Sequence, residues 1–449
     1  TWLIDGTLEP GSLTFFGVKE AKEGFFLGSW KIPTENEEDI SHCLTETANE
    51  YGKPDRILHD LSERMDNACS LAFPNSLHNF CNYHFLANMG KDLYEMPQAE
   101  LSKRLRAIKL QVSLKNQRGG QTQRLRKAVS EENISLALSD LLSGKEMNIC
   151  WSESFGREVL LALHSWFLDY ADDGHRQGFP FDPYLLYFHR RIVVALEASN
   201  RLLSCSTIRE KMPKVFFNFC QQLENYLLDP IICRAASLYE KANNIFGRVR
   251  STLRLFTSRS NPMHDLYELS SDSQEEVKNA LGTLRNELYE ENIKCDDPKE
   301  YNLYEIALAH IDKYGARLLP SDEFSSRDEI LVRTTNGIES DWSSGKRIRR
   351  QTHGRKKLTR DFQALQAGRV EIGKRLHPKA ERVDQIPLVV SVVALLEHFR
   401  NVEHARPLHA VDERRGGGVG GNGDLYRRGL GDCQGDVRLF DDGVALGLG

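Results

Sequence analysis

The feature that most constrains the fold is a change of pattern near position 90 of the chain. Before it, strand-like runs alternate with helical runs, and after it the runs are helical. Residues 12–20 and 24–32 are aromatic-rich and predict two antiparallel strands joined by a polar turn. Residues 34–51 predict a helix, with Thr34 or Asn36 as its cap and acids in its first turn. The pattern therefore places a sheet first and a helical region after it.

The order of elements before position 90 indicates a fold class. Residues 2–4 are a short apolar run that ends at an Asp-Gly turn signal. Pro54 is followed by a short strand over 56–60 and a helix over 61–73, and residues 76–85 predict a strand that runs into a helix. By analogy of element order, the sequence predicts an α/β protein with a small mixed sheet of the RNase H type, in which catalytic acids emerge at strand ends.

Helix-forming sequence dominates from about Lys91 to Lys313, where Leu, Phe and Tyr recur at intervals of three and four residues. This predicts a large all-α insertion of six or more helices within the RNase H-like core, before the segment that contains Glu339. The Gly/Arg-rich tail has no helical or strand period, so a disordered segment and an out-of-frame translation both stay open. The expected parts are the first part of the core at 1–90, the insertion at 91–325, the C-terminal part of the core at 326–369 and the tail at 370–449.

Charge is unevenly distributed along a chain whose net charge is -5. Residues 101–127 contain nine Lys or Arg and no acid, and residues 341–360 contain eight Lys or Arg against one Asp. The net charge argues against a uniformly basic coat for nucleic acid, whereas the two basic runs are candidate phosphate-contacting segments. Each run is also what a solvated helix face would contain.

The cysteines and the apolar runs indicate a cellular compartment. Nine scattered cysteines without a Cys-x-x-Cys pair predict neither a disulfide framework nor a four-ligand zinc ribbon. The longest apolar run, near 386–396, is too short to span a membrane, and no signal-peptide pattern is visible. We therefore expect an intracellular protein, in the cytoplasm or nucleoid if the source is prokaryotic. Thr1 in place of an initiator Met predicts a fragment.

Three acidic residues have settings in which carboxylates often do chemistry. Asp5 follows an apolar strand and precedes Gly6, and Asp60 ends a second strand before a helix. Glu339 opens a helix crowded with cations. Singly, each has an ordinary explanation as a turn residue, an N-cap or a surface charge. Together, three carboxylates can hold two Mg²⁺ or Mn²⁺ ions, which bind hard oxygen ligands. Asp66, within a helix, is the alternative to Asp60.

The last acid belongs to an amphipathic helix. At 100° per residue, Glu339 shares a face with a serine and two cations, Ser343, Lys346 and Arg350. The neighbouring face is suited to packing on the body of the protein, and it contains Ile338, Trp342 and Gly345.

Four stretches carry a resemblance to a known family: WLIDGT (2–7), PDRILHD (54–60), FPNSLHNFCNYHF (73–85) and RTTNGIESDWSSGKRIRRQTHGRKK (333–357). Over about residues 1–368, the chain resembles the DDE transposases of the Mutator-like group and their prokaryotic insertion-sequence relatives. The resemblance implies an RNase H-like fold and an enzyme that cleaves DNA at element ends and transfers the strand to a target. It also implies a homo-oligomer.

The resemblance assigns roles to particular residues. It implies that Asp5 and Asp60 are the catalytic aspartates and Glu339 the final glutamate, which together hold two Mg²⁺ or Mn²⁺ ions. The family's Cys-x-x-His signature matches Cys81 and His84, for which half a zinc site and a buried Cys with a hydrogen-bonded His are both open. The expected contacts to double-stranded DNA, at terminal repeats and target, are Lys346, Arg347, Arg349, Arg350, Arg355, Lys356 and Lys357.

Two other functions are compatible with the same residues. A DNA-binding protein derived from a transposase would need the basic segments and no metal. An RNase H-type nuclease would use the three acids without strand transfer.

Overall fold

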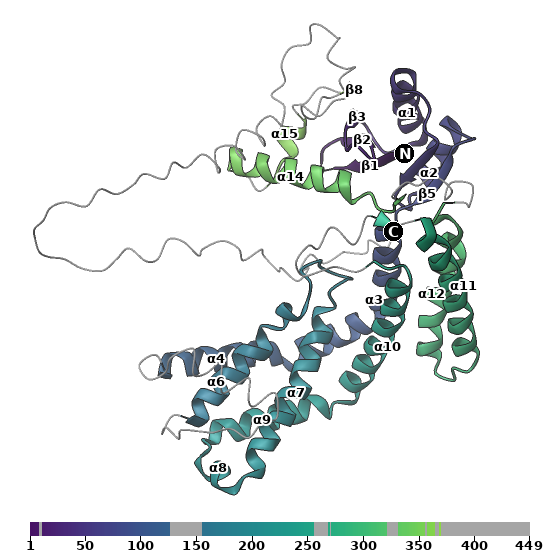
Figure 1. The fold of residues 1–449 in the computed structure, drawn as a ribbon. Coiled ribbons are helices and arrows are strands. Elements are labelled where there is room, and N and C mark those ends of the chain that lie inside the picture. Colours follow the sequence, from purple (N-terminus) through teal and green to yellow (C-terminus); the bar gives the residue numbers. More distant parts are fainter. Residues whose placement is uncertain are drawn as a thin grey trace, which may run out of the picture. The chain divides into compact units, whose positions relative to one another are not determined.

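A computed structural model gives the fold of the chain (Figure 1). The described residues are 1–8, 11–125, 155–255, 268–269, 271–320, 331–354, 357–363 and 368–369. All of them belong to one compact unit, which spans residues 1–397. The tail expected at 370–449 lies outside the described residues, so both explanations of it stay predictions.

The described strands form a mixed sheet at the start of the chain. They are β1 (Trp2–Thr7), β2 (Thr14–Glu20), β3 (Phe26–Ile32), β4 (Arg56–His59), β5 (Leu77–Phe80) and the two-residue β8 (Gly368–Arg369). Their order is β5-β4-β1-β2-β3-β8. The pairs β1–β2 and β2–β3 are antiparallel, whereas β1, β4 and β5 are parallel. The predicted α/β class is confirmed at this level.

The first strand continues past its predicted end. The sequence favoured a turn at Asp5 and Gly6, but these residues pair with Gly17 and Phe16 in a ladder that ends at Thr7. Pairing with the neighbouring strand overrides the local turn preference of Asp-Gly. As a result, Asp5 is held within the sheet, where only 7% of its surface is exposed.

One face of the sheet is covered by two helices from the first third of the chain. These are α1 (Glu37–Tyr51) and α2 (Glu63–Ala72). The Asn36 side chain caps α1 by accepting a hydrogen bond from Asp39 N–H, as one of the two predicted caps. Phe16 of β2 is fully buried in the apolar cluster between sheet and helices.

The other face is covered by helices from the end of the described chain, α14 (Asn336–His353) and α15 (Thr359–Gln363). Phe15 points to this face, because successive strand residues alternate. It belongs to a cluster with Ile338 and Trp342, which are 0% and 8% exposed. The packing face predicted for the helix is therefore confirmed for these two residues, and α14 is fixed against the sheet.

The remaining described residues are mainly helical (Figure 1). One apolar cluster connects these helices with each other, and α3 packs along α10 and α12. A short antiparallel pair, β6 (Glu268–Leu269) and β7 (Leu331–Val332), leads toward α14. The helices are α3 (Asn82–Ile108), α4 (Leu110–Leu125), α6 (Phe155–Leu168), α7 (Tyr184–Ser204), α8 (Ser206–Lys211), α9 (Lys214–Leu227), α10 (Pro230–Thr252), α11 (Ser271–Ile293) and α12 (Pro298–Tyr314), with 3-10 turns η1 (Tyr170–Asp173) and η3 (Gly315–Arg317).

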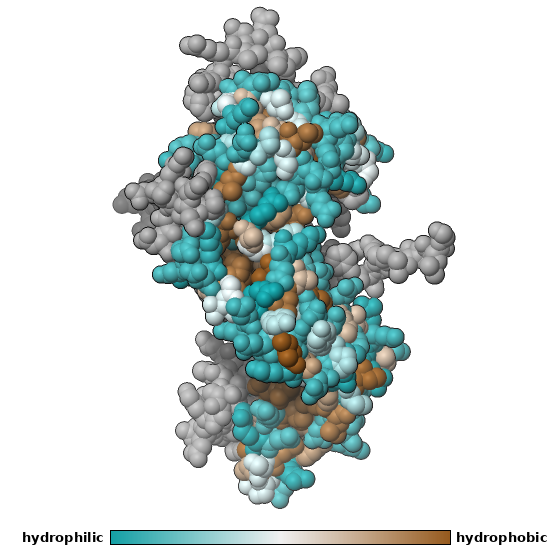
Figure 2. Space-filling model, turned by 90° about the vertical axis from the view of Figure 1, so that its right-hand side faces the viewer, coloured by the Kyte–Doolittle hydropathy of each residue, from teal (hydrophilic) through white to brown (hydrophobic). Residues whose placement is uncertain are grey.

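The surface agrees with this division into buried and exposed faces. Hydrophilic residues cover most of the face shown in Figure 2, with apolar residues in smaller groups between them. Of the helices in the described part of the chain, none has the length and apolar character needed to cross a membrane.

Candidate metal site and its basic flank

Asp5 and Asp60 are brought together by strand register. The parallel neighbours β1 and β4 pair Leu3 with Leu58. Two residues further along each strand direction come Asp5 and Asp60, and residues two apart point to the same face. Burial raises the pKa of Asp5 well above its usual value, and the negative charges of Glu339 and Asp60 raise it further. The three predicted acids are therefore close enough to interact electrostatically.

Hydrogen bonds fix the turn that carries Asp60. The Ser62 N–H donates to Asp60 Oδ1 at 2.9 Å. His59 Nδ1 lies 2.7 Å from the backbone carbonyl oxygen of Asp60. Because a carbonyl oxygen only accepts, this ring nitrogen carries the proton. The carboxylate is therefore held at the end of β4 by its own neighbours in sequence.

Glu339 reaches the same region from the first turn of α14. Thr335, just before the helix, donates from Oγ1 to Glu339 Oε1 at 2.8 Å. His84 Nε2 lies 3.7 Å from the same oxygen. A carboxylate in the first turn also interacts favourably with the helix dipole. Glu339 is thus oriented by two side chains before any ligand is considered.

Cys81 and His84 are neighbours near Glu339, and each shifts the pKa of the other. Cys81 is fully buried at the start of α3, and its sulfur accepts the Thr335 N–H at 3.3 Å. Burial alone would raise the pKa of Cys81, but the charge and hydrogen bond of His84 lower it below its usual value. Burial acts to lower the pKa of His84, but Cys81 and Glu339 raise it to about 10. This arrangement matches the hydrogen-bonded alternative for the pair.

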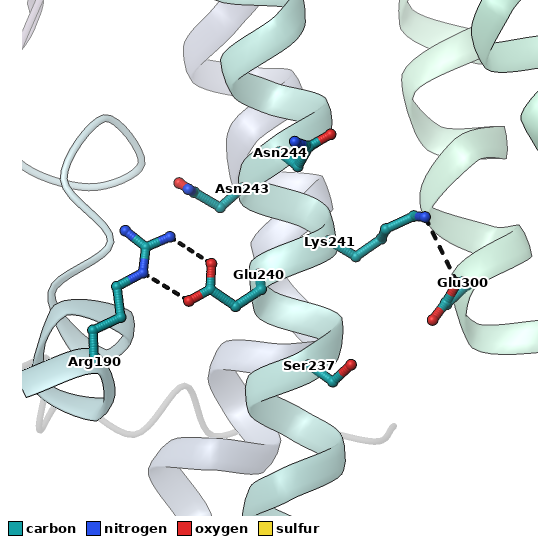
Figure 3. A pocket seen from close by; sticks show the side chains of 7 residues that line it. All are labelled: Arg190, Ser237, Glu240, Lys241, Asn243, Asn244 and Glu300. Carbon is teal, nitrogen blue, oxygen red and sulfur yellow. Dashed lines mark hydrogen bonds and ion pairs between the residues drawn. The ribbon is translucent and has the colours of Figure 1, made fainter. Parts of the chain in front are cut away.

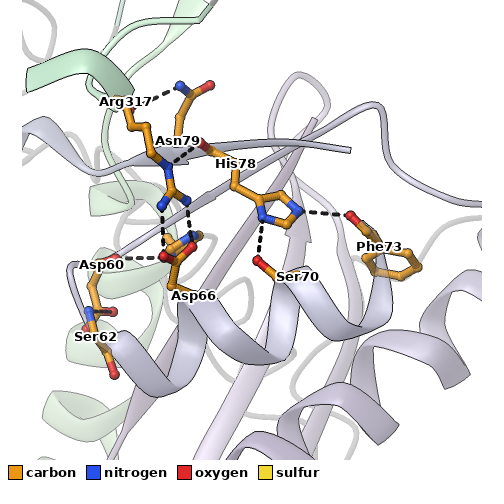
Figure 4. A network of polar contacts seen from close by, with 9 residues as sticks. Asp60, Ser62, Asp66, Ser70, Phe73, His78, Asn79 and Arg317 are labelled. Atoms are coloured by element: carbon orange, nitrogen blue, oxygen red, sulfur yellow. Dashed lines mark hydrogen bonds and ion pairs between the residues drawn. The ribbon is translucent and has the colours of Figure 1, made fainter. Parts of the chain in front are cut away.

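Asp66, the alternative to Asp60, is engaged elsewhere. Both of its oxygens accept from the Arg317 guanidinium, at 2.5 and 2.7 Å (Figure 4). Although burial opposes it, the hydrogen bonds and charge of Arg317 hold the pKa of Asp66 well below its usual range. An acid already neutralised by a bidentate arginine is a poor candidate for a metal ligand.

Glu35 is an acid near the site that the sequence alone did not single out. Its Oε1 lies directly against Gly6, where any β-carbon would overlap it. Burial raises the pKa of Glu35, and the charge of Asp60 raises it further. Gly6, directly after Asp5, is visible in the sequence, but only the folded chain shows that the Glu35 side chain occupies the space beside it.

The basic residues after Glu339 fall into four groups. Lys346 is bonded within the protein, since its ammonium donates to Thr7 Oγ1 at 2.8 Å and to the Leu8 carbonyl at 2.9 Å. The remaining predicted DNA contacts are placed as follows: Arg347, Arg350 and Lys357 are exposed, Arg349 is half-buried, and Arg355 and Lys356 lie outside the described residues. The role of all seven in binding DNA stays a prediction.

A separate pocket of about 430 Å³ lies between α7, α10 and α12 (Figure 3). Arg190 and Glu240 form a two-bond ion pair at its wall, and Lys241 lies 3.9 Å from Glu300. Its charges therefore neutralise each other, and the three candidate acids do not line it.

The oxygen atoms at this candidate site suit a hard cation as ligands. Asp5, Asp60 and Glu339 offer carboxylate oxygens, which Mg²⁺ and Mn²⁺ prefer as ligands. The buried charge of Asp5 is one that a cation would stabilise. As placed, no group of three or more His, Cys, Asp or Glu within the described residues has the spacing to hold a metal ion.

Comparison with known proteins adds no relative: no protein-family model matches the chain, and a search of curated proteins gives no significant match.

Proposed function

We propose that this chain is the catalytic region of a DDE-type DNA transposase, which cleaves DNA at element ends and joins the strand to target DNA. The observation that carries the proposal is the convergence of Asp5, Asp60 and Glu339 from β1, β4 and α14. An RNase H-like identity for the core is part of the proposal. The sheet supports it, because adjacent parallel strands bring two acids to one edge.

In this function the three carboxylates present their oxygens to two Mg²⁺ or Mn²⁺ ions. Bound there, the ions would activate the attacking water or 3′-hydroxyl and stabilise the leaving oxygen. Thr335 and His84 hold Glu339 in its orientation. A cation beside Asp5 would favour its ionised form, which burial and its acidic neighbours disfavour.

The basic residues after Glu339 support double-stranded DNA as the substrate in this proposal. Arg347 and Arg350 are exposed on the same helix as Glu339, and Lys357 follows shortly after. Phosphate groups of double-stranded DNA are the natural partners of such cations. Lys346 has a second role, since it ties α14 to the end of β1. An intracellular location and a homo-oligomeric assembly are expected with this function.

The proposal is tested by nicking of supercoiled plasmid DNA with Mn²⁺ or Mg²⁺, which requires no knowledge of the terminal repeats. Wild type should nick, and Glu339→Gln should lose at least about 100-fold in rate, as expected for a group that stabilises transition-state charge. Asp341→Asn is the matched control, because Asp341 is an acid of the same helix that pairs with Lys19. The control should retain the activity.

Strand transfer is tested with DNA taken from both sides of the gene. Cleavage and joining that are both lost in Glu339→Gln support the proposal. Cleavage without joining identifies an RNase H-type nuclease instead. An inert wild type that still binds DNA identifies a transposase-derived DNA-binding protein, and the proposal then fails.

A further inference from the structure

The end of the helical insertion is attached to α2, the helix after the second acid, and to β5 (Figure 4). Arg317, in the turn η3 after α12, makes a bidentate ion pair with Asp66 in the first turns of α2. Its Nε donates to the His78 carbonyl at 3.2 Å, and its guanidinium stacks over Phe80 at 4.1 Å. Asn79 returns a hydrogen bond to the Arg317 carbonyl at 3.1 Å. Arg317 is thus held by contacts with both α2 and β5.

The His59 ring lies between Asp66 and the backbone of Asp60. His59 is completely buried, and its Nε2 lies 3.5 Å from Asp66 Oδ1. Its Nδ1 lies 2.7 Å from the Asp60 carbonyl oxygen. Because the two nitrogens occupy opposite sides of a rigid ring, a shift of Asp66 moves the ring or breaks one of these contacts.

A second ion pair makes the same connection. Lys313, one turn before the end of α12, lies 3.3 Å from Glu63 at the start of α2. Both pairs join the last turns of the insertion to the helix that begins three residues after Asp60. The insertion is therefore anchored beside the second acid.

We propose that Arg317 is a positioning residue for Asp60, acting through Asp66 and His59, so that the helical insertion sets the geometry of the second acid. The inference rests on the proposed role of Asp60 as a metal ligand. Residues that orient a ligand from outside typically change metal affinity or activity by 10- to 100-fold when replaced.

The test compares full-length wild type with Arg317→Met and Asp66→Asn. Each variant should need about 10- to 100-fold more Mn²⁺ for half-maximal plasmid nicking. Asp66→Asn leaves the contacts of Arg317 with His78 and Phe80 in place, so it separates positioning from simple packing. The double variant should be no worse than either single one, because both act on one chain of contacts.

Arg285→Met is the matched control. Arg285 forms a similar two-bond pair with Asp312, at 2.8 and 3.1 Å, but both residues belong to the insertion. The control should keep the Mn²⁺ requirement of wild type. Arg317→Lys, which keeps the charge and loses the bidentate geometry, should be intermediate.

A second readout does not depend on catalysis. Hydrogen exchange of the peptide that contains Ser62, whose N–H donates to Asp60 Oδ1, should speed up in Arg317→Met and Asp66→Asn, and stay unchanged in Arg285→Met. Exchange and Mn²⁺ requirement that both match wild type overturn the positioning role. A wild type that never nicks overturns the proposed function instead, while the exchange result still decides the positioning of Asp60.

Discussion

Asp312 in the helical insertion and Asp5 in the sheet have opposite electrostatic settings. In the insertion, Asp312 is bound by Arg285, whose hydrogen bond and charge hold the pKa of that carboxyl below its usual value. At the sheet edge, burial and neighbouring carboxylates raise the pKa of Asp5. The first kind of acid stabilises the fold when ionised, and the second destabilises it. The difference is what the proposed metal site would need, because a bound cation would offset the cost of ionising Asp5.

The largest expected effect comes from separating the third acid from the other two. Trp342→Ala should lower the free energy of unfolding by about 3–5 kcal/mol, because it empties the contact between α14 and the sheet. It should also reduce metal-dependent nicking under conditions where the variant is still folded. Urea unfolding followed by circular dichroism, with nicking measured below the transition, checks both.

Phe219→Ala is the control for Trp342→Ala, because Phe219 is fully buried in the apolar cluster of the insertion. It should cost a similar free energy and keep nicking in the folded protein. Equal loss of nicking in both variants would remove the distinction between the two regions.

Neutralising an acid should have opposite effects on stability in the two regions. Asp5→Asn should raise the melting temperature by about 1–3 °C, because it removes a group whose ionisation burial and acidic neighbours disfavour, and should lower nicking on the order of 100- to 1,000-fold. Asp312→Asn should lower the melting temperature slightly and leave nicking unchanged. Scanning calorimetry without metal, paired with the nicking assay, checks the signs. A lower melting temperature for Asp5→Asn would contradict the comparison.

Acid pH should weaken the helical insertion through a buried histidine. Burial lowers the pKa of His164 to about 4, so the folded state excludes a proton that the unfolded state binds below about pH 6.5. The neutral His164 ring therefore does not lower the free energy of unfolding above pH 6.5. As the pH falls from 6.5 toward 4, the free energy of unfolding decreases by about 3 kcal/mol in total. Urea unfolding at pH 7.5, 6 and 5 measures it. His164→Gln should show a smaller pH dependence over this range.

The smallest effect is expected for the exposed ion pair Arg285–Asp312. Arg285→Met should change the melting temperature by less than about 2 °C, since exposed pairs are screened by solvent. High salt should change wild type by a similarly small amount. A shift of several degrees would show that ion pairs in the insertion contribute more to its stability than their exposure implies.

Local periodicity explains which parts of the fold could be predicted. Ile338 and Trp342 are four residues apart on one helix, and this spacing alone assigns them to a buried face. The same holds for Asn36 as a cap, because capping is a local hydrogen bond. The end of β1 was wrongly predicted, because the pairing of Asp5 with Gly17 depends on a different strand.

Contacts between distant parts of the chain, which local patterns do not predict, are even more important in the candidate site. The three acids stood out by their local settings, and the resemblance gave roles to them and to the Cys81–His84 pair. Local pattern could not show that Thr335 touches Cys81 across 254 positions of the chain. Glu35 was missed for the same reason, since its place against Gly6 exists only after folding. Arg317 lies in no motif at all, and only its contacts connect it with Asp60.

The position of the third acid on α14 has a consequence for synthesis. Asp5 and Asp60 leave the ribosome before the helical insertion, whereas Glu339 follows after it. At about 5–20 residues per second, the interval is on the order of tens of seconds. Throughout it, the nascent chain lacks one of the three acids. Under the proposed chemistry, cleavage of DNA would therefore begin only after α14 has been made.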